Sequence, residues 1–417
     1  MTVAPERISA NHWPGLDTVP SGPRTAVSAR IARRLFITAV NRLDVTVTTA
    51  NGESWGKGGP SMHIVRPDEF FARIGTGALI GFGEAYLTGS WDAEDLGAFL
   101  TVLASDISTL VPAPLQKLRT LAVKRPPKKQ KSSQENSQDN IAHHYDLSND
   151  LFELFLDETL SYSCALFEGD PSEARVADLV SAQERKIDRM LDEAGVTEGT
   201  RLLEIGSGWG ALAIRAARRG ATVRTITLSL EQKALADRRI VAAGLSEQIS
   251  VEICDYREVQ GSFDAIVSVE MIEAVGWQYW QTYFETLDRV LAPGGKICVQ
   301  AITMPHDRML ATRNTYTWIN KYIFPGGFLP SVQVVDEITA EHTSLKMHEP
   351  FSMGLHYVPT LRMWDEAFLA RSEEVLELGF DETFLRMWHF YLEYSLAGFA
   401  SEYIGDHQLT FSREGAR

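Results

Sequence analysis

A glycine-rich loop after a short apolar run is the first place where this sequence could bind a cofactor. The segment LLEIGSGWG covers residues 202–210 and carries Gly206, Gly208 and Gly210. Glycines let the backbone turn tightly and approach a ligand closely at the end of a strand. A dinucleotide loop would place its third glycine one residue later and would bind a pyrophosphate at the helix N-terminus. The spacing therefore favours S-adenosylmethionine, with Glu204 accepting from its methionine ammonium; a structural turn and a dinucleotide site are the alternatives.

Polar residues after the next two apolar runs could hold the rest of such a ligand. Thr227 and Gln232 can hydrogen-bond ribose hydroxyls, at a place where nucleotide-binding folds often carry an acid. Asp255 offers a carboxylate to the exocyclic amine of adenine, and Tyr256 offers a ring for stacking. The alternative for Asp255 is a surface acid that caps the next helix.

Five strand candidates alternate with helical stretches and would position these residues. They cover 201–205, 222–228, 249–254, 263–269 and 296–302. Strands separated by helices of about 10–20 residues indicate a parallel, doubly wound sheet. The predicted fold class is α/β, with a class I, Rossmann-like methyltransferase sheet.

A smaller α+β unit with no obvious chemistry precedes this sheet. Its pattern predicts a helix over 26–36, strands over 43–49 and 62–65, and an apolar helix over 96–110. Asp68 is expected to cap one further helix.

The segment between the two units is basic. Seven cations precede its first acid, namely Lys117, Arg119, Lys124, Arg125, Lys128, Lys129 and Lys131. This segment is either a solvated tether or a region attracted to anionic lipid headgroups. We predict an N-terminal domain over 1–111 as a candidate for membrane docking or oligomerisation, a basic linker over 112–138, and a domain with the doubly wound sheet over 139–417.

Composition narrows the class of protein. The 417 residues are 44% hydrophobic and 23% charged, which is typical of a globular chain, and the net charge of -15 argues against general nucleic-acid binding. Cys164, Cys254 and Cys298 are too scattered for a disulfide framework or a zinc site, so a cytoplasmic setting is expected. Apolar runs stay below the roughly 18 residues of a membrane span, so a role on lipid would be peripheral.

Four further segments, read in order with the glycine loop, carry a family resemblance. They are HHYDLSND at 143–150, YSCA at 162–165, EMIEAVG at 270–276 and YIFPGGFLP at 322–330. The ordered set resembles the cyclopropane fatty acid synthase family, which uses S-adenosylmethionine to modify cis double bonds of phospholipid acyl chains. The N-terminal region looks most like the branch that makes 10-methylene, tuberculostearic-type fatty acids. The resemblance implies that residues 139–417 form a methyltransferase domain with lipid-binding insertions.

The resemblance also implies a catalytic base. Methyl transfer to an alkene leaves a carbocation, and the family is understood to hold a bicarbonate ion that removes the proton. The matching positions are Cys164, Glu273, Gln300, Tyr357 and the backbone of Ile302. Many members carry histidine where this chain has Gln300, and glutamine cannot titrate near neutral pH, which excludes a histidine relay there.

Two tyrosines complete the predicted site, and two neighbouring histidines are not part of it. Tyr145 and Tyr162 would form a wall near the sulfonium and the acyl chain, where aromatic faces favour cations; plain core packing is the alternative. His143 and His144 stand beside acids, but nothing else supplies a ligand set, so no metal is predicted. Cys164 could equally be an inert buried thiol.

The expected reaction is methylation of the cis bond of an unsaturated, oleoyl phospholipid to a 10-methylene chain, which a separate reductase would saturate. A cyclopropane product, methylation of a small molecule or a protein, and a catalytically silent lipid-binding protein are the alternatives. The expected partners are membrane phospholipid and a second copy of the chain in a homodimer, with no nucleic acid. The protein would act at the inner face of the membrane, with 322–330 and the aromatic helix 384–403 as walls of an acyl tunnel.

Overall fold

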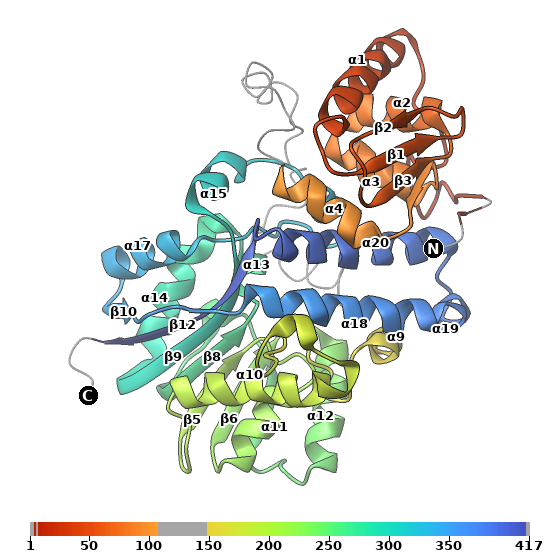
Figure 1. The fold of residues 1–417 in the computed structure, drawn as a ribbon. Helices are drawn as coiled ribbons and strands as arrows, with labels where there is room; N and C mark the ends of the chain where they lie inside the picture. Colours follow the sequence, from red (N-terminus) through yellow and green to blue (C-terminus); the bar gives the residue numbers. More distant parts are fainter. Residues whose placement is uncertain (1–3, 6, 107–147, 414–417) are drawn as a thin grey trace. The chain divides into compact units, whose positions relative to one another are not determined.

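The computed structural model describes residues 4–5, 7–106 and 148–413, in two compact units (Figure 1). Unit 1 gathers the described residues up to 106 with Tyr316–Ile323 and Leu361–Tyr403. Unit 2 gathers the described residues of 148–315, Phe324–Thr360 and 404–413. Tyr145, the two neighbouring histidines and the basic linker lie outside the described residues. The predicted domain boundaries stay a prediction, although the contacts group two C-terminal segments with the N-terminal residues.

Unit 1 combines a small sheet with helices. The sheet order is β2-β1-β3-β4, with β1 at Thr46–Thr49, β2 at Ser54–Trp55, β3 at Ser61–Ile64 and β4 at Trp91–Ala93. The helices are α1 (Pro23–Val40), α2 (Pro67–Gly77), α3 (Leu79–Leu87), α4 (Leu96–Ser105), α16 (Trp318–Tyr322), α19 (Ser372–Glu377) and α20 (Glu382–Ala400). Aromatic rings fill its core, and Phe390 of α20 packs against Tyr86, Trp91 and Trp318. These ring contacts explain why the C-terminal helix α20 belongs to the same compact unit as the N-terminal helices.

The predicted helices and strands of the N-terminal region are present, but the predicted cap is wrong. α2 begins at Pro67 after Arg66, and no side chain caps it; Asp68 lies in its first turn. Proline suits the first helical position because its φ is preset and it has no N–H to satisfy. The cap that Asp68 was expected to provide is therefore not needed.

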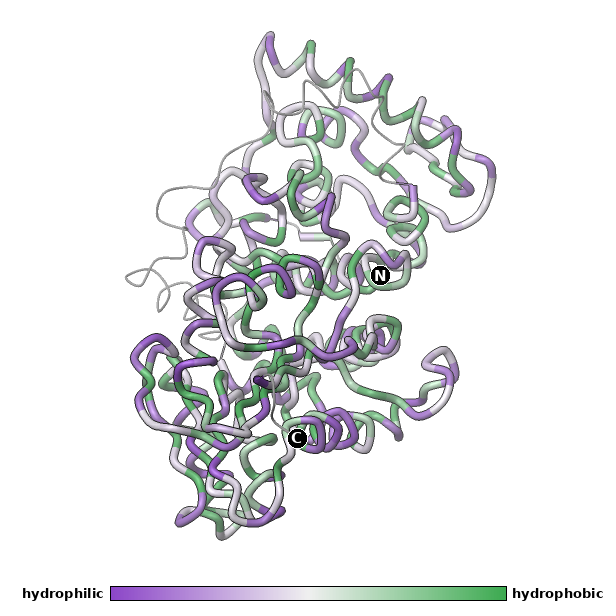
Figure 2. The backbone as a smooth tube through the Cα atoms, turned by 90° about the vertical axis from the view of Figure 1, so that its left-hand side faces the viewer, coloured by the Kyte–Doolittle hydropathy of each residue, from purple (hydrophilic) through white to green (hydrophobic). Residues whose placement is uncertain are grey.

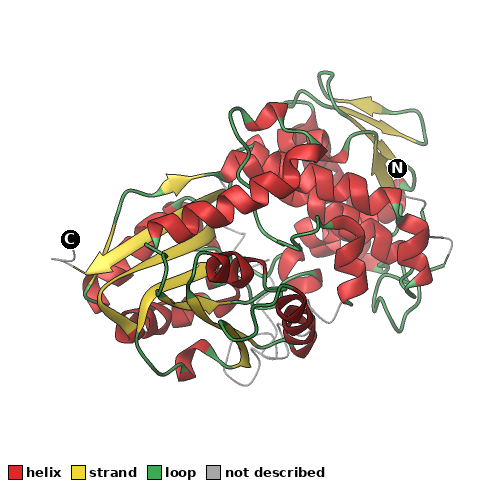
Figure 3. Cartoon of the chain, turned by 90° about the horizontal axis from the view of Figure 1, so that it is seen from below, coloured by secondary structure: helices red, strands yellow, loops and turns green. Residues whose placement is uncertain are grey.

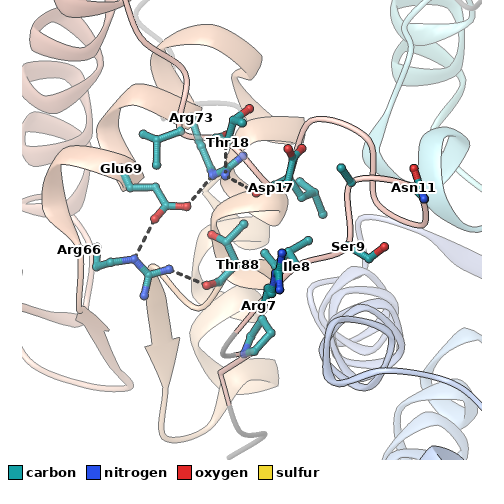
Figure 4. A pocket seen from close by; sticks show the side chains of 14 residues that line it. Arg7, Ile8, Ser9, Asn11, Asp17, Thr18, Arg66, Glu69, Arg73 and Thr88 are labelled. Carbon is teal, nitrogen blue, oxygen red and sulfur yellow. Dashed lines mark hydrogen bonds and ion pairs between the residues drawn. The ribbon is translucent and has the colours of Figure 1, made fainter.

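A pocket of about 870 Å³ lies within unit 1, beside the N-terminal arm (Figure 4). Arg73 donates to Glu69 Oε1 at 2.8 Å and to the carbonyl of Leu16 at 2.9 Å. Arg66 donates to Glu69 Oε2 at 2.8 Å and to the carbonyl of Thr88 at 2.5 Å. The Arg73 guanidinium holds the arm against α2, and Arg66 ties α2 to the carbonyl of Thr88, so we interpret this pocket as structural.

Unit 2 is built on an eight-stranded sheet. Its order is β10-β12-β9-β8-β5-β6-β7, with β11 paired to β12. The strands are β5 (Arg201–Ile205), β6 (Thr222–Thr227), β7 (Ile249–Ile253), β8 (Phe263–Val269), β9 (Leu291–Thr303), β10 (Leu345–Met347), β11 (Phe351–Ser352) and β12 (Gly405–Arg413). All five predicted strands are present, and β5 to β9 are parallel as expected. Strand β12, which the sequence analysis did not predict, runs antiparallel to β9.

Helices cover both faces of this sheet (Figure 3). They are α9 (Asn149–Phe155), α10 (Leu179–Glu193), α11 (Ala211–Arg218), α12 (Leu230–Ala242), α13 (Ile272–Val275), α14 (Trp280–Val290), α15 (His306–Thr312) and α17 (Val332–His342), while α18 (Tyr357–Ala370) has residues in both units. Side chains alternate along a strand, so Leu202 enters the core under α10 and α11, whereas Leu203 enters the core under α14. The predicted α/β class is confirmed.

In the coloured part of the chain, hydrophobic and hydrophilic residues are interspersed (Figure 2). In the part of the chain that the structure describes, no helix is both long enough and apolar enough to cross a membrane.

Candidate active site

The site lies where the strand order of unit 2 reverses. Strands β5, β6 and β7 follow one another in one direction, and β8 and β9 extend the sheet in the other, so β5 and β8 flank the switch point. Ligands of open α/β sheets bind outside the carboxyl ends of the strands at such a point. Ser268 Oγ donates to the carbonyl of Ile205 at 3.0 Å and ties the two strand ends together.

The glycine loop follows β5 directly. Gly206, Gly208 and Gly210 have φ of 93°, 46° and 88°, which disfavour other residues. A Cβ on Gly206 would lie 2.5 Å from Cγ of Met271, the second residue after β8, so the loop and the end of β8 are in close contact.

The carboxylate of Glu204 fits the proposed role toward S-adenosylmethionine. The residue is 3% exposed, and its Oε2 has no hydrogen-bond partner among the described residues. Burial raises the pKa of Glu204 to about 8. A buried carboxyl that lacks a partner at the end of β5 suits a ligand ammonium, which would supply the missing donor and favour the charged form.

The predicted ribose and adenine residues lie at the next two strand ends. Thr227 Oγ1 donates to Gln232 Oε1 at 2.9 Å, so the pair is preformed at the start of α12. Asp255 accepts from the backbone N of Arg257 at 2.9 Å and from its guanidinium, which matches the capping alternative. Burial raises the pKa of Asp255, but the hydrogen bonds from Arg257 outweigh it and the pKa is lowered. Tyr256 packs edge-on against Tyr283 at 5.3 Å. Their roles toward adenine stay predictions.

Glu270 forms the centre of the second half of the site. It follows β8 with a φ of 50°, in the left-handed region that non-glycine residues rarely adopt. Its Oε1 accepts from the backbone N of Cys164 at 3.0 Å and from Gln300 Nε2 at 2.8 Å. Its Oε2 accepts from the hydroxyl of Tyr357 at 2.6 Å.

Two further carboxyl groups lie next to Glu270. Glu273 Oε1 accepts from the backbone N of Ile302 at 2.5 Å, and Asp406 Oδ2 accepts from Gln300 Nε2 at 2.9 Å. Burial and the charge of Glu270 raise the pKa of Glu273 to about 8. Burial, with the charges of Glu270 and Glu273, raises the pKa of Asp406 well above its usual range.

A buried lysine faces this acidic group. Lys186 of α10 is 1% exposed and donates to Ser163 Oγ at 2.5 Å. Burial lowers the pKa of Lys186, while the charges of Glu270 and Asp406 act in the opposite direction. Cys164 is fully buried, and burial raises the pKa of its thiol well above the usual range, so the thiol is neutral, while its backbone N–H donates to Glu270. Across residues 4–5, 7–106 and 148–413, no set of three or more His, Cys, Asp and Glu side chains could hold a metal ion.

Comparison with known proteins identifies the family. The model of the family described as mycolic acid cyclopropane synthetase matches residues 132–409. The chain is 49% identical over 414 residues to the tuberculostearic acid methyltransferase UfaA1 of Mycobacterium tuberculosis, a match that covers 98% of this chain and 97% of that protein. The chain belongs to the mycolic acid cyclopropane synthetase family.

Other relatives agree with this assignment. The cyclopropane-fatty-acyl-phospholipid synthase of Escherichia coli K12 is 33% identical over 86% of this chain and 89% of its own length. The solved cyclopropane synthase MmaA2 from Mycobacterium tuberculosis has a TM-score of 0.60 and 30% identity, covering 66% of this chain and 98% of that one. A structure of the mycolic acid cyclopropane synthase CmaA1 complexed with SAH and CTAB has the same TM-score and identity, covering 66% of this chain and 97% of that one. The predicted family and methyltransferase class are confirmed.

The residues expected to bind bicarbonate in this family are brought together, but they do not fit the ion. Cys164, Gln300 and Tyr357 direct their donors at the Glu270 carboxylate. Glu273 accepts directly from the Ile302 backbone, the other expected contact. The hydrogen bonds assigned to bicarbonate are therefore already made within the chain.

Sequence reasoning missed three residues of this site. Glu270 is the first residue of the EMIEAVG segment and directly follows a predicted strand. Its place at the carboxyl end of that strand could have identified it as a candidate site residue. Lys186 lies on an amphipathic helix, where a lysine is normally solvated. Asp406 carries no local signal, because only the antiparallel pairing of β12 places it opposite Ile302. Tyr162, which was predicted, packs against Phe152 at 5.1 Å, and its role toward a ligand stays a prediction.

Proposed function

We propose that the protein transfers the methyl group of S-adenosylmethionine to the cis double bond of an unsaturated, oleoyl phospholipid and produces a 10-methylene-branched chain. The observation that carries this proposal is the 49% identity along nearly the whole chain to a tuberculostearic acid methyltransferase. The site supports it, because a loop suited to S-adenosylmethionine lies against a group of carboxyls around Glu270 that can remove a proton.

S-adenosylmethionine, when bound, supplies an electrophilic methyl group. The alkene π pair forms the new carbon–carbon bond, the carbon–sulfur pair stays on sulfur, and the neighbouring alkene carbon becomes cationic. A hydride then moves from the methylated carbon to that cation. Loss of a methyl proton leaves its bonding pair as the exocyclic double bond. In this chain, Glu204 would hold the methionine ammonium, and the acids around Glu270 would stabilise the cation and accept the proton.

A cyclopropane product is the second candidate. The 33% identity to a cyclopropane-fatty-acyl-phospholipid synthase favours it, and its first step is the same. The two products differ in whether the hydride moves before the proton leaves. Without the shift, the bonding pair of the methyl C–H closes the three-membered ring.

The segment after α16 supports an acyl-chain wall next to the acids. The backbone N of Phe328 donates to the carbonyl of Glu273 at 2.8 Å, and the Phe328 ring stacks on Trp280 at 5.9 Å. Residues 324–330 therefore pass close to the reacting groups. Docking on the inner face of the membrane and delivery of the methylene product to a separate reductase are parts of the same proposal.

The test is product analysis. The protein would be incubated with methyl-labelled S-adenosylmethionine and dioleoyl phosphatidylglycerol vesicles, and the released fatty acids analysed by mass spectrometry before and after ozonolysis. The proposal predicts labelled lipid that ozonolysis converts to an unlabelled ketone, with the labelled carbon leaving as formaldehyde. Labelled lipid that resists ozonolysis would mean a cyclopropane, and absence of label from lipid would refute lipid methylation altogether.

A further inference from the structure

We propose that the Glu270 carboxylate is the built-in proton acceptor of this enzyme and performs the task expected of a bicarbonate ion. The inference rests on the proposed function, because it concerns the proton that lipid methylation must release. It changes the identity of the base from a bound ion to a residue of the chain.

The hydrogen bonds of Glu270 carry the proposal. Cys164, Gln300 and Tyr357 donate to its two oxygens at 3.0, 2.8 and 2.6 Å. Family resemblance assigns the same three residues to bicarbonate. A carboxylate and a bicarbonate both present two oxygens on one planar carbon, so one can replace the other at the same donors. While Glu270 accepts from these three donors, they are not available to an ion.

The backbone of Glu270 supports a specialised role. A φ of 50° is costly for a residue with a side chain, and such conformations persist at functional sites when their surroundings fix them. The backbone N of Glu270 donates to the carbonyl of Gln300 at 2.8 Å, which holds this turn at the end of β8. The conformation directs the carboxylate toward the donors on Cys164 and Tyr357.

Hydrogen bonding distinguishes Glu270 from the two neighbouring acids. Glu270 accepts from Cys164, Gln300 and Tyr357, whereas Glu273 accepts from the backbone N of Ile302 and Asp406 accepts from Gln300. Glu273 Oε2 and Asp406 Oδ1 are buried without a partner in the described part of the chain. Burial raises the pKa of Glu270 as well, while its hydrogen bonds and the charge of Lys186 act in the opposite direction. Because donors stabilise the charged form of a carboxyl, Glu270 has more such support than either neighbouring acid.

The amide of Gln300 is oriented for this purpose. Gln408 Nε2 donates to Gln300 Oε1 at 3.2 Å, which leaves Gln300 Nε2 to face Glu270 and Asp406. Gln408 lies directly opposite Gln300 in the pairing of β12 with β9. Glutamine thus serves as a donor to a protein carboxylate at a position where many relatives carry histidine.

The proposed step is balanced. A C–H bond of the added methyl group breaks, its proton moves to an oxygen of Glu270, and its electron pair forms the methylene double bond or closes the ring. Glu270 becomes a neutral carboxylic acid, and the cationic carbon becomes neutral. The proton then leaves to solvent before the next turnover, since Glu270 retains partial exposure.

Two substitutions of Glu270 separate the built-in base from a bound one. Glu270→Gly removes the carboxylate, frees its three donors and suits the positive φ, so this variant should fold. Glu270→Gln keeps the volume but cannot accept the proton. Glu285→Gln, an exposed change on α14, is the matched control. Each protein would be assayed with labelled S-adenosylmethionine and oleoyl phospholipid, in buffer freed of carbon dioxide and again with added bicarbonate. Calorimetry with S-adenosylhomocysteine would verify the fold.

The wild type and Glu285→Gln should turn over equally with and without bicarbonate. Glu270→Gly should lose about 100-fold or more without bicarbonate and regain much of the loss with it, whereas Glu270→Gln should stay inactive in both. Wild-type turnover that collapses without bicarbonate, or a Glu270→Gly variant that is fully active without it, would overturn the inference.

A binding measurement makes the test independent of turnover. In ¹³C NMR with labelled bicarbonate and S-adenosylhomocysteine, only Glu270→Gly should broaden the bicarbonate signal. Binding by the wild type would overturn the inference even if the enzyme methylates lipid. If no lipid were methylated by any variant, the proposed function would fail, while the binding result would still decide whether Glu270 occupies the anion position.

Discussion

In unit 1 the buried arginines face acceptors on several segments, whereas in unit 2 buried acids interact with one another and with Lys186. Arg73 reaches Glu69 and the carbonyls of Leu16 and Thr18. Arg386, fully buried on α20, donates to the carbonyls of Tyr86 and Trp91 and to Asp92. Cations that are paired in this way stabilise a fold.

The acids of unit 2 are only partly satisfied. One carboxyl oxygen on each of Glu204, Glu273 and Asp406 is buried and lacks a hydrogen-bond partner among the residues described. Burial raises the pKa of all three. A buried carboxyl oxygen without a hydrogen-bond partner lowers the stability of the fold, and acids with a perturbed pKa cluster at functional sites.

One pair in unit 1 departs from this contrast. Burial and the neighbouring Asp365 raise the pKa of Glu393 to about 8. Asp365 also contacts His389 Nδ1 at 2.8 Å. A Cβ on Gly97 would lie 2.0 Å from Glu393 Oε2, so the pair is tightly enclosed within the core of unit 1. The two units therefore differ in how most of their buried charged groups are paired, although this acid pair of unit 1 is an exception.

The largest expected effect is on the stability of unit 1. Arg386→Met would leave Asp92 and two buried carbonyls without their donor, and breaking a buried ion pair costs about 3–5 kcal/mol. Denaturant unfolding should therefore show a loss of that size, with exposed Arg34→Gln on α1 unchanged. If Arg386→Met were as stable as the wild type, the buried arginines of unit 1 would not stabilise its fold as described.

A smaller effect is expected on turnover when the donor shared by two acids is removed. Gln300→Leu leaves Glu270 and Asp406 without the Nε2 hydrogen bonds, each worth about 1.5–3 kcal/mol when the acceptor is charged. Turnover at neutral pH should fall about 100-fold. The acid limb of the pH profile should move to higher pH, because a carboxyl with fewer donors has a higher pKa. A fall without that movement would indicate only a packing role.

Tyr357→Phe removes one donor from Glu270 and should have a milder effect of the same kind. A single hydrogen bond to a charged group contributes about 1.5–3 kcal/mol, so turnover should drop roughly 20-fold. The acid limb should again move to higher pH, and the affinity for S-adenosylhomocysteine in calorimetry should stay the same. An unshifted profile would mean that the phenol does not stabilise the charged form of Glu270.

Glu204 should make cofactor binding pH-dependent. Its pKa of about 8 means that the carboxyl gains charge as the pH rises toward 8. If only the charged form binds the methionine ammonium, affinity should rise roughly tenfold from pH 6 to pH 7, where the ammonium stays charged. Calorimetry on Glu204→Gln should give weaker binding with no such rise. A flat wild-type profile would place the ammonium elsewhere.

Sequence patterns predicted features formed by residues close together in the chain. They missed residues that enter the site only through the pairing of distant strands. The glycine loop and the five parallel strands follow from residue type and periodicity. Cys164, Gln300 and Tyr357, which the family resemblance grouped, all donate to Glu270, and their assignment to catalysis stays a prediction. Asp406 and Gln408 enter the site because β12 inserts antiparallel beside β9, from a segment more than a hundred residues along the chain. Glu270 was visible in its motif, but its positive φ and its three donors appear only in the fold.

The most direct test of the account is a crystal structure of the protein with S-adenosylhomocysteine, grown in bicarbonate buffer. The account predicts that the Glu270 carboxylate remains hydrogen-bonded to the N–H of Cys164, the amide of Gln300 and the hydroxyl of Tyr357, with no ion between them. A structure in which Glu270 has swung away and a bicarbonate accepts those three hydrogen bonds would contradict it.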